Sequence, residues 1–417
     1  MSAATHTTPV VMLRSPHHGG LGIARSLGRM GVPVYAVEAA RWEPAAVSRY
    51  CRGRFLLDVA NTPPDQAVSM LRTIARQVGR RPILMPTTDR MCLWLAEHAG
   101  LLRSDFRFPE QDPDLVRTLC DKSRMQELAA RSGVPIARST LPASQRDIDR
   151  FLETASFPVM VKETGGGSLR RRAGAGKFIV RSAGELAELY ARAGDPGHPD
   201  FLVQEWIPGE DWMFNGYFDG RSQCLFGMTG MKIRRFPAHT GVTSLGVCLA
   251  NPQVLQTTCA FMRAIGYRGI LDIGYRRDRR DGQYKVLDVN PRIGCTFRLF
   301  VGAGGLDVAR ALYLDLTGKA VPAAEAVDGR KWLVEDFDLF SALRTWREGT
   351  LSIREWLLSL SGVQEAACFA LDDPLPFLMT PVADCCELLQ WRRARRTTRL
   401  RGGQTAPALP LVSTKRS

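Results

Sequence analysis

Residues 269–276, GILDIGYR, and residues 283–292, QYKVLDVNPR, decide the fold of this 417-residue chain. Apolar and polar residues alternate in both segments, as they do in half-buried β-strands. The residues between them, 277–282 (RDRRDG), have the composition of a turn. We therefore expect an antiparallel hairpin that forms part of a larger sheet.

Polar side chains gather at one end of this hairpin. Side chains alternate along a strand, so Asp288 and Asn290 should share a face, with Tyr284 and Val286 on it too. If residues 277–282 form the turn, Asp272 lies opposite Asp288 on the same face. Three oxygen-bearing side chains would then converge.

Asp272, Asp288 and Asn290 are the predicted metal ligands. Hard oxygen donors without a nearby imidazole or thiolate suit Mg²⁺, with Mn²⁺ as the alternative ion. Arg292 would lie beside them, where its guanidinium could hold an oxyanion or phosphate. The competing interpretation is a set of hairpin-end polar groups that face water.

A second hairpin is expected upstream, with strands at 157–163 (FPVMVKE) and 178–181 (FIVR). Lys162 ends the first strand, and the loop 165–177 (GGGSLRRRAGAGK) would let backbone amides approach an anion closely. This is not a Walker A loop, because Arg171 stands at the leading glycine position and Phe178 at the hydroxyl position. The alternative is a flexible basic hairpin tip.

The first hundred residues alternate strand-like and helix-like segments: VVML, GGLGIARSLGRMG, VPVYAVE and RPILMPTTDR. This rhythm predicts a Rossmann-like domain with an amphipathic helix behind a glycine turn. A dinucleotide fingerprint is the alternative, but Arg25 occupies its third glycine position after Gly20 and Gly22.

The pattern is helical from Asp114 to Ser132, and Gly133-Val134-Pro135 ends it. Further helices are expected near 183–193 and 252–265, and strands within 201–220 and 223–230. We expect α/β and α+β architecture, in five segments: residues 1–115, a Rossmann-like domain; 116–203, a small α+β subdomain; 204–325, a larger mixed subdomain with the metal site; 326–390, a C-terminal extension; and 391–417, a basic, disordered tail.

Composition agrees with a globular protein, since 45% of residues are apolar and 24% are charged. There is no apolar run of the roughly 20 residues that a membrane span needs, and the N-terminus lacks the pattern of a secretory signal, so we expect a soluble cytoplasmic protein without a membrane partner.

The ten cysteines are scattered, without zinc-site spacing. Of the net charge of +14, eight positive charges lie in residues 391–417, which contain no acid, so a solvated tail is favoured over a nucleic-acid-binding face.

Taken in order, these motifs resemble the ATP-grasp superfamily over residues 1–320, particularly its carboxylate–amine ligases that are similar to D-aspartate ligase. The resemblance implies ATP and Mg²⁺ as cofactors. It implies Lys122, in DKSRMQELAARSGVPI, and Lys162 as phosphate-binding lysines, and Gly165, Gly166 and Gly167 as part of a loop that closes on the γ-phosphate. This chain departs from the family in two places: the family usually has Glu where Asp288 stands, and the loop carries three successive arginines, 170–172.

The segment VQEWIPGED resembles the family's adenine linker. This implies backbone recognition of the base by Glu205 and Ile207, flanked by Trp206, with Gln204 nearby and Glu210 or Asp211 on the ribose. The loop AHTGVTSLG, which includes His239, resembles a further triphosphate-side loop. In such proteins the Rossmann-like domain forms a wall of the active site, and the substrate-side candidates are Arg14, Ser15, His17, His18, Thr87, Thr88, Asp89 and Arg90.

The resemblance implies a ligase that forms a C–N bond between a small-molecule carboxylate and an amine through an acyl phosphate. Asp272, Asp288 and Asn290 match the metal ligands, and Arg292 and Lys162 the residues that neutralise charge during transfer. Three alternatives remain: a small-molecule kinase on the same fold, an NAD-dependent oxidoreductase, and a nucleic-acid-binding protein that uses the arginine tail. A homodimer is also expected. The sequence names neither substrate nor pathway.

Overall fold

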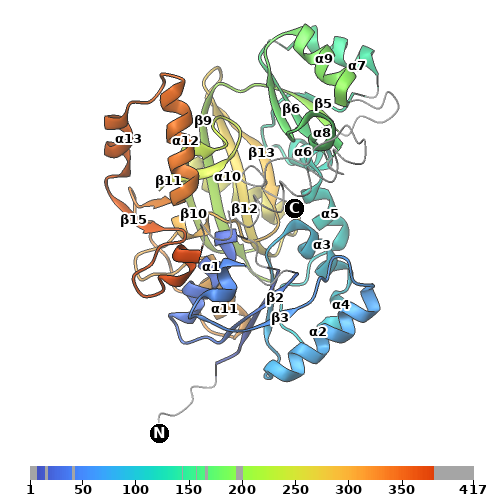
Figure 1. Ribbon diagram of the computed structural model, residues 1–417. Coiled ribbons are helices and arrows are strands. Elements are labelled where there is room, and N and C mark those ends of the chain that lie inside the picture. Colours follow the sequence, from blue (N-terminus) through green and yellow to red (C-terminus); the bar gives the residue numbers. More distant parts are fainter. Residues whose placement is uncertain are drawn as a thin grey trace, which may run out of the picture.

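The computed structural model describes residues 7–14, 17–39, 43–142, 144–155, 157–164, 168–193 and 201–379. Three sheets organise this part of the chain, as Figure 1 shows: a parallel sheet in the N-terminal domain, a large mixed sheet, and a small sheet that lies apart from the N-terminal domain. The expected α/β and α+β class is confirmed. The described helices include none that is both long enough and apolar enough to cross a membrane.

The N-terminal sheet has four parallel strands in the order β3-β2-β1-β4. Its strands are β1 (Val10–Leu13), β2 (Val34–Glu38), β3 (Cys51–Leu56) and β4 (Ile83–Pro86). Its helices are α1 (His17–Gly28), η1 (Pro44–Val47), α2 (Pro64–Val78), α3 (Asp89–Glu97) and α4 (Ala99–Leu102). The carboxyl ends of β1 and β4 lie side by side, which brings the start of α3 to the edge of the sheet where ligands bind in such folds.

The prediction of a glycine turn before the first helix is wrong, because α1 begins at His17 and the glycines lie inside the helix. These glycines allow close packing. A Cβ on Gly19 would lie 3.3 Å from the Cα of Cys295, and one on Gly22 would lie 2.9 Å from the ring of Phe297. The segment therefore brings the N-terminal domain against the large sheet, and no glycine turn remains there to hold a dinucleotide.

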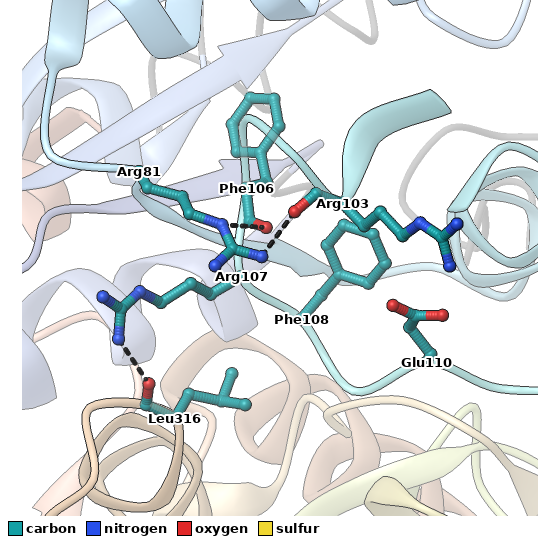
Figure 2. A pocket seen from close by; sticks show the side chains of 7 residues that line it. All are labelled: Arg81, Arg103, Phe106, Arg107, Phe108, Glu110 and Leu316. Atoms are coloured by element: carbon teal, nitrogen blue, oxygen red, sulfur yellow. Dashed lines mark hydrogen bonds between the residues drawn. The ribbon is translucent and has the colours of Figure 1, made fainter. Parts of the chain in front are cut away.

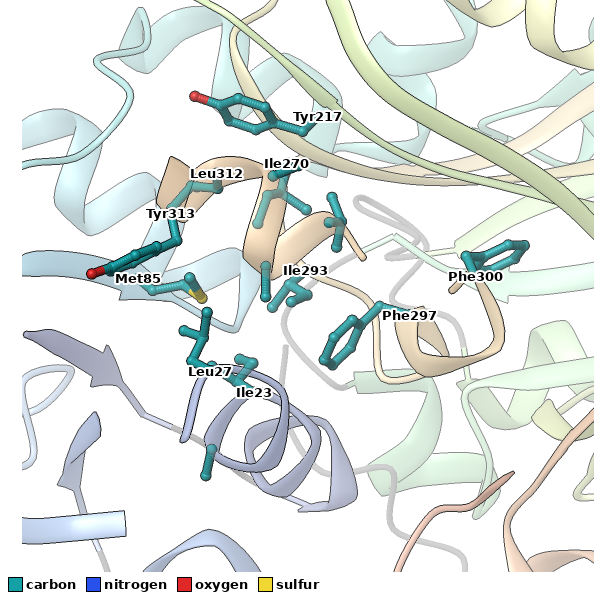
Figure 3. Close-up of a cluster of buried hydrophobic side chains, with 14 of the residues drawn as sticks. Ile23, Leu27, Met85, Tyr217, Ile270, Ile293, Phe297, Phe300, Leu312 and Tyr313 are labelled. Atoms are coloured by element: carbon teal, nitrogen blue, oxygen red, sulfur yellow. The ribbon is translucent and has the colours of Figure 1, made fainter. Parts of the chain in front are cut away.

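One hydrophobic core joins the N-terminal domain to the large sheet, as Figure 3 shows. Ile23 and Leu27 of α1 contribute to the same cluster as Tyr217, Ile270 and Phe297. All five are buried. This shared core fixes the position of the N-terminal strand ends relative to the predicted metal site.

The large sheet has seven strands in the order β13-β12-β9-β10-β11-β14-β15. They are β9 (Gly209–Phe218), β10 (Cys224–Phe236), β11 (Val242–Cys248), β12 (Gly269–Asp278), β13 (Tyr284–Asn290), β14 (Lys331–Leu333) and β15 (Val363–Ala366). Helix α10 (Pro252–Ala264) packs on one face through a cluster that includes Phe261 and Tyr275. The short helix η2 (Phe297–Leu299) and α11 (Val308–Leu316) follow the hairpin.

The predicted helical segment 114–132 contains two helices, α5 (Pro113–Cys120) and α6 (Lys122–Arg131). Asp121 separates them, because its extended backbone ends α5 and its carboxylate accepts hydrogen bonds from Ser123 N and Arg124 N at the start of α6. The first residue of α6 is therefore Lys122.

The small sheet has the order β5-β8-β6-β7 and all its pairings are antiparallel. Its strands are β5 (Ser139–Thr140), β6 (Val159–Glu163), β7 (Lys177–Val180) and β8 (Phe201–Glu205). Helices α7 (Gln145–Leu152), α8 (Ser168–Ala173) and α9 (Ala183–Ala193) belong to the same layer. The glycine-rich connection between β6 and β7 thus contains a helix, which Leu169 anchors in the core, and is more than a flexible tip.

The segment predicted as a C-terminal extension adds β14 and β15 to the large sheet and supplies α12 (Glu335–Arg347) and α13 (Ile353–Leu360). Helix α12 buries polar residues, Asp338 and Ser341, and exposes apolar ones: Leu339, Phe340, Leu343 and Trp346. The buried face is polar because Asp338 pairs with Arg234 of β10. The predicted basic tail lies outside the described residues.

Candidate active site

The hairpin of β12 and β13 carries the three predicted metal ligands on one face. Asp272 pairs with Asn290, and Gly274 pairs with Asp288, so Asp288 lies opposite a position two residues further along β12 than the sequence predicted. The register shifts between Gly274 and Tyr275, where β13 contains one extra residue. Such a bulge redirects the side chains that follow it.

Because of this bulge, Val286 does not share the face of Asp288 and Asn290, although the sequence predicted that it would. Val286 pairs with Tyr275, and both are fully buried in the core under α10. Tyr284 packs edge-on against Trp212, which also contacts this core. The two apolar residues therefore face the core, while Asp288 and Asn290 face the opposite side.

Two glycines make room for the carboxylates. A Cβ on Gly274 would lie 2.8 Å from Oδ1 of Asp288, and a Cβ on Gly294 would lie 2.5 to 2.8 Å from the carboxylate of Asp272. Real Cβ atoms essentially never approach this closely. The acids can therefore hold these positions only because both neighbours lack a side chain.

Hydrogen bonds connect the metal-ligand candidates to the N-terminal domain. The Asn290 amide donates to Oδ2 of Asp272 at 3.3 Å, and its oxygen accepts from Nη2 of Arg292 at 3.3 Å. Nε of Arg292 donates to Oδ1 of Asp89 at 2.6 Å. Asp89 is the first residue of α3, so a residue beyond the end of β4 holds the predicted catalytic arginine.

Mg²⁺ fits the donors that this face offers. They are two carboxylates and one amide oxygen, which are hard oxygen donors. Among the described residues, no group of three or more His, Cys, Asp or Glu side chains could hold a metal ion. Burial raises the pKa of Asp272 to about 6, with Arg292 opposing the rise and Asp288 adding to it. A divalent cation between the two carboxylates would stabilise their charged forms.

Lysines from three parts of the fold surround Asp288. Lys122 begins α6, Lys162 and Lys177 lie on neighbouring strands of the small sheet, and Lys232 lies on β10. Desolvation would raise the pKa of Asp288, but these four lysines together lower it. One exposed carboxylate therefore faces four ammonium groups, which leaves an excess of positive charge.

Two of the lysines have lowered pKa values. Lys162 is 8% exposed, and its Nζ donates to Oε1 of Gln204 at 2.6 Å. Burial lowers its pKa to about 7, with Lys177 adding to the decrease and Asp288 opposing it. Nζ of Lys122 donates to the carbonyl of Glu163, and burial lowers the pKa of Lys122 to about 8. Lysines with strongly lowered pKa values are candidates for functional sites.

The predicted adenine linker joins β8 to β9 and lies between the two sheets. Gln204 is buried, and its Nε2 has no hydrogen-bond partner. The Glu205 carboxylate accepts from the backbone N of Arg138 at 3.0 Å and from Arg280 at 3.1 Å, so this side chain has a structural role. Ile207 is 3% exposed.

Further along the linker, the side chain of Asp211 is 6% exposed and forms ion pairs with Arg235 and Arg276. The guanidinium of Arg276 also lies 4.6 Å from the ring centre of Trp206. Glu210 is half-buried. Because Asp211 already has two arginine partners, Glu210 is the better placed of the two acids for a ribose.

The other predicted residues vary in their surroundings. The ring of His239 contacts Glu348 at 2.9 Å, and its backbone is left-handed with φ of 69°. The Thr88 hydroxyl caps α3 by accepting from Met91 N, and the ring of His18 lies 5.5 Å from that of Trp332. The predicted residues Gly165, Gly166, Gly167 and Ser15 lie outside the described residues.

Sequence reasoning missed Lys177, Lys232, Arg276 and the two spacing glycines as site residues. Lys232 lies on β10 beyond residue 230, where the predicted strand ended. Arg276 alternates with Asp272 and Gly274 on β12. Lys177 ends the glycine-rich segment, and only the pairing of β6 with β7 brings it opposite Lys162.

No family model matches the chain. It is 25% identical to a D-aspartate ligase of Enterococcus faecium over 244 residues, which cover 56% of this chain and 58% of the relative. The chain therefore spans little more than half the length of this curated relative.

Two solved structures resemble the fold. N5-carboxyaminoimidazole synthetase from Staphylococcus aureus, complexed with ADP, has a TM-score of 0.62 at 14% identity and covers 82% of this chain and 86% of its own. The biotin carboxylase domain dimer of Hydrogenobacter thermophilus 2-oxoglutarate carboxylase, in complex with MgADP, ADP and bicarbonate, has a TM-score of 0.57 at 17% identity and covers 78% and 74%. Both likenesses concern the fold.

Proposed function

From the premise that this chain is a member of the ATP-grasp superfamily, we propose that it is an ATP-dependent ligase that joins a carboxylate to an amine. The observation that carries the proposal is the group of cations around Asp288, two of them with lowered pKa values. Such a group is electrostatically unfavourable unless an anion occupies it, and a triphosphate supplies several negative charges.

The lysines have distinct roles in this proposal. Lys162 and Lys177 approach the phosphates from the small sheet, and Lys232 approaches them from the large sheet. Lys122 donates to the carbonyl of Glu163 at the end of β6, so it links this end of the small sheet to the phosphates. The glycine-rich segment 165–167, which lies outside the described residues, is proposed to close on the γ-phosphate.

The base is proposed to lie between the sheets, beside the linker that starts at Gln204. The buried, unpartnered Nε2 of Gln204 supports this, because it is a donor without an acceptor in the protein. The backbone of Glu205 and Ile207 would then bind adenine, and Glu210 the ribose.

Mg²⁺ would be held by Asp272, Asp288 and Asn290, where it would screen the phosphate charge and orient the phosphates for in-line transfer. Arg292, fixed by Asp89 and Asn290, is proposed to stabilise the substrate oxyanion as the carboxylate attacks the γ-phosphorus. Lys162 neutralises charge on the transferred group. The amine then displaces phosphate from the acyl phosphate, which leaves ADP and phosphate as products.

The similarity to D-aspartate ligase supports the acid–amine class of reaction. The direct test supplies ATP and Mg²⁺ with pools of carboxylates and amines and measures ADP and condensed products by mass spectrometry. A ligase forms ADP only with a matched pair, whereas the alternative kinase forms ADP and a phosphorylated product without an amine. Asp288→Asn should fold and lose turnover, and undiminished turnover of this variant would contradict the metal assignment.

We also propose that the protein forms a homodimer. The exposed apolar stripe of α12, formed by Leu339, Leu343 and Trp346, supports self-association because these residues recur on one side of the helix. The biotin carboxylase domain with this fold is also a dimer. Sedimentation analysis should give twice the chain mass, and Leu343→Glu should give the monomer. A monomeric wild-type protein would refute this proposal.

A further inference from the structure

The cavity in Figure 2 contains arginines that do not converge on one point. The guanidinium groups of Arg103 and Arg107 lie at its opposite ends, and that of Arg103 lies beside Glu110. The guanidinium of Arg81 donates to backbone carbonyls. These side chains therefore offer no common point for a ligand, and we turn to a pair of thiols elsewhere in the fold.

Two cysteines lie where α10 packs on the large sheet, which Figure 1 shows. Cys224 is the first residue of β10, and Cys259 lies on α10. Both pack against the core that contains Phe261 and Tyr275. The proposed metal ligands face the other side of the sheet, so this pair is separate from the proposed active site.

The contacts of α10 determine which of its residues faces Cys224. Leu255, Cys259 and Arg263 are four positions apart, so they lie on one side of the helix. A Cβ on Gly227 would lie 3.1 Å from Cδ1 of Leu255 and 2.9 Å from Sγ of Cys224. The turn of α10 that precedes Cys259 is therefore next to Cys224.

The following turn of α10 contacts the other side of Cys224. Nη2 of Arg263 donates to Oε1 of Gln223, which directly precedes Cys224, at 3.4 Å. Cys259 thus lies midway between two residues of its own helix face, both of which contact the immediate surroundings of Cys224. This placement directs the two thiols toward each other.

The thiols form a hydrogen bond in which Cys224 is the donor. This bond lowers the pKa of Cys259, burial opposes the decrease, and the charge of Arg263 adds to it. The same bond, together with burial, raises the pKa of Cys224. Cys259 is therefore the more easily ionised of the two, and the thiolate is the nucleophilic form of cysteine.

Both thiols are also accessible. Cys224 and Cys259 are free cysteines and only half-buried, whereas Cys248 of β11 is fully buried. A small oxidant in water can therefore reach the pair. Because the sulfur atoms already face each other, a disulfide of about 2.05 Å requires only a small approach of the two side chains.

We propose that Cys224 and Cys259 form a reversible disulfide when the protein meets a peroxide. The thiolate of Cys259 attacks one oxygen of hydrogen peroxide, the O–O bond breaks, and the hydroxide that leaves takes up the proton that Cys259 released. Cys259 is then a sulfenic acid, and the first water has formed.

The second step closes the disulfide. The sulfur of Cys224 attacks the sulfur of Cys259, the S–O bond breaks, and the hydroxide that leaves takes the proton of Cys224 as a second water. The two sulfurs together lose two electrons, and the peroxide gains them. Exchange with a thiol reductant reverses the reaction. The bond would tie α10 covalently to β10.

Peptide mapping of the full-length protein after treatment with equimolar hydrogen peroxide tests this proposal. Free thiols are blocked with iodoacetamide, and trypsin then releases residues 222–232 and 236–263 as separate peptides. Mass spectrometry should find these peptides joined through Cys224 and Cys259, and dithiothreitol should separate them. Cys224→Ser should abolish the cross-link and leave a sulfenic acid on Cys259, which dimedone captures.

Cys248 provides the matched control, because it lies on the same tryptic peptide as Cys259. Cys248→Ser should form the cross-link as wild type does, and circular dichroism verifies that each variant is folded. A cross-link that persists in Cys259→Ser, or that is lost in folded Cys248→Ser, would place the bond at Cys248 and overturn the proposal. Wild-type protein in which excess peroxide leaves Cys224 reduced, or oxidises Cys259 to a sulfinic acid without a cross-link, would overturn it equally.

Discussion

Replacing Lys162 with methionine is expected to stabilise the nucleotide-free protein and to weaken its binding of ADP. Burial lowers the pKa of Lys162 from 10.5 to about 7. Because one pKa unit corresponds to 1.36 kcal/mol, the charged form costs the folded state about 5 kcal/mol at pH values below 7. Methionine removes that cost but leaves the carbonyl oxygen of Gln204 without its donor, at about 2 kcal/mol. The net gain is therefore about 3 kcal/mol.

The difference in stability between the variant and wild type should depend on pH. Between pH 7 and 10.5 the folded wild-type protein has released the Lys162 proton that the unfolded chain still binds, so wild-type stability rises with pH across this window. The variant lacks this rise. Its advantage should be largest near pH 6.5 and should disappear by about pH 10, where loss of the hydrogen bond to Gln204 dominates.

Thermal unfolding at pH 6.5 and pH 9, with and without ADP and Mg²⁺, measures both effects. At pH 6.5 the variant should melt a few degrees above wild type without nucleotide. ADP at one hundred times its Kd adds about 2.7 kcal/mol to wild type, and a tenfold weaker Kd reduces this by about 1.3 kcal/mol. Lys285→Met is the contrasting control, since Lys285 pairs with Asp278 at 2.7 Å and its removal should lower the melting temperature. A variant less stable than wild type at pH 6.5, or an unchanged response to ADP, would refute the reasoning.

Three further substitutions test other contacts. Asp89→Asn removes the charge that holds Arg292 and should lower kcat about tenfold to a hundredfold while nucleotide binding, measured by titration with ADP, stays within twofold. Gly294→Ala should abolish Mg²⁺-dependent ADP release, because its methyl group would overlap the carboxylate of Asp272; normal activity would show that this carboxylate is free to move. Asp373→Ala removes a carboxylate that is 1% exposed and pairs with an arginine of α1, so urea unfolding should show a loss of about 3 kcal/mol.

The metal-ligand hairpin was predictable because its signal is local. Alternation along each strand and a turn-forming sequence between the strands suffice to identify two paired strands. The bulge was less evident, although the sequence contains a sign of it. Val286 and Val289 are both apolar and both buried in one core, yet they are three positions apart. Strict alternation cannot place two such residues on one face, so an extra residue between them was required.

The lysine group was not predictable in full, because its members come from elements far apart in the chain. Lys162 could be recognised at the end of a strand, but Lys177 and Lys232 gain their significance only when two sheets face each other. The glycines of α1 misled for a related reason. Gly19 and Gly22 suggest a turn when only the local sequence is considered, whereas their function is to admit Cys295 and Phe297 against a helix.

The distribution of charge between the two sheets explains why the proposed site needs both. The large sheet supplies Asp272 and Asp288, and the small sheet supplies Lys162 and Lys177. Each set is unfavourable alone, since like charges are close together within it, and Asp288 compensates only part of the lysine charge. A metal-bound triphosphate presents a cation to the acids and anionic oxygens to the lysines, so it satisfies both sheets at once. An anion without the metal would satisfy only the lysines. On this argument nucleotide and metal should bind cooperatively, because each reduces the repulsion that the other would meet.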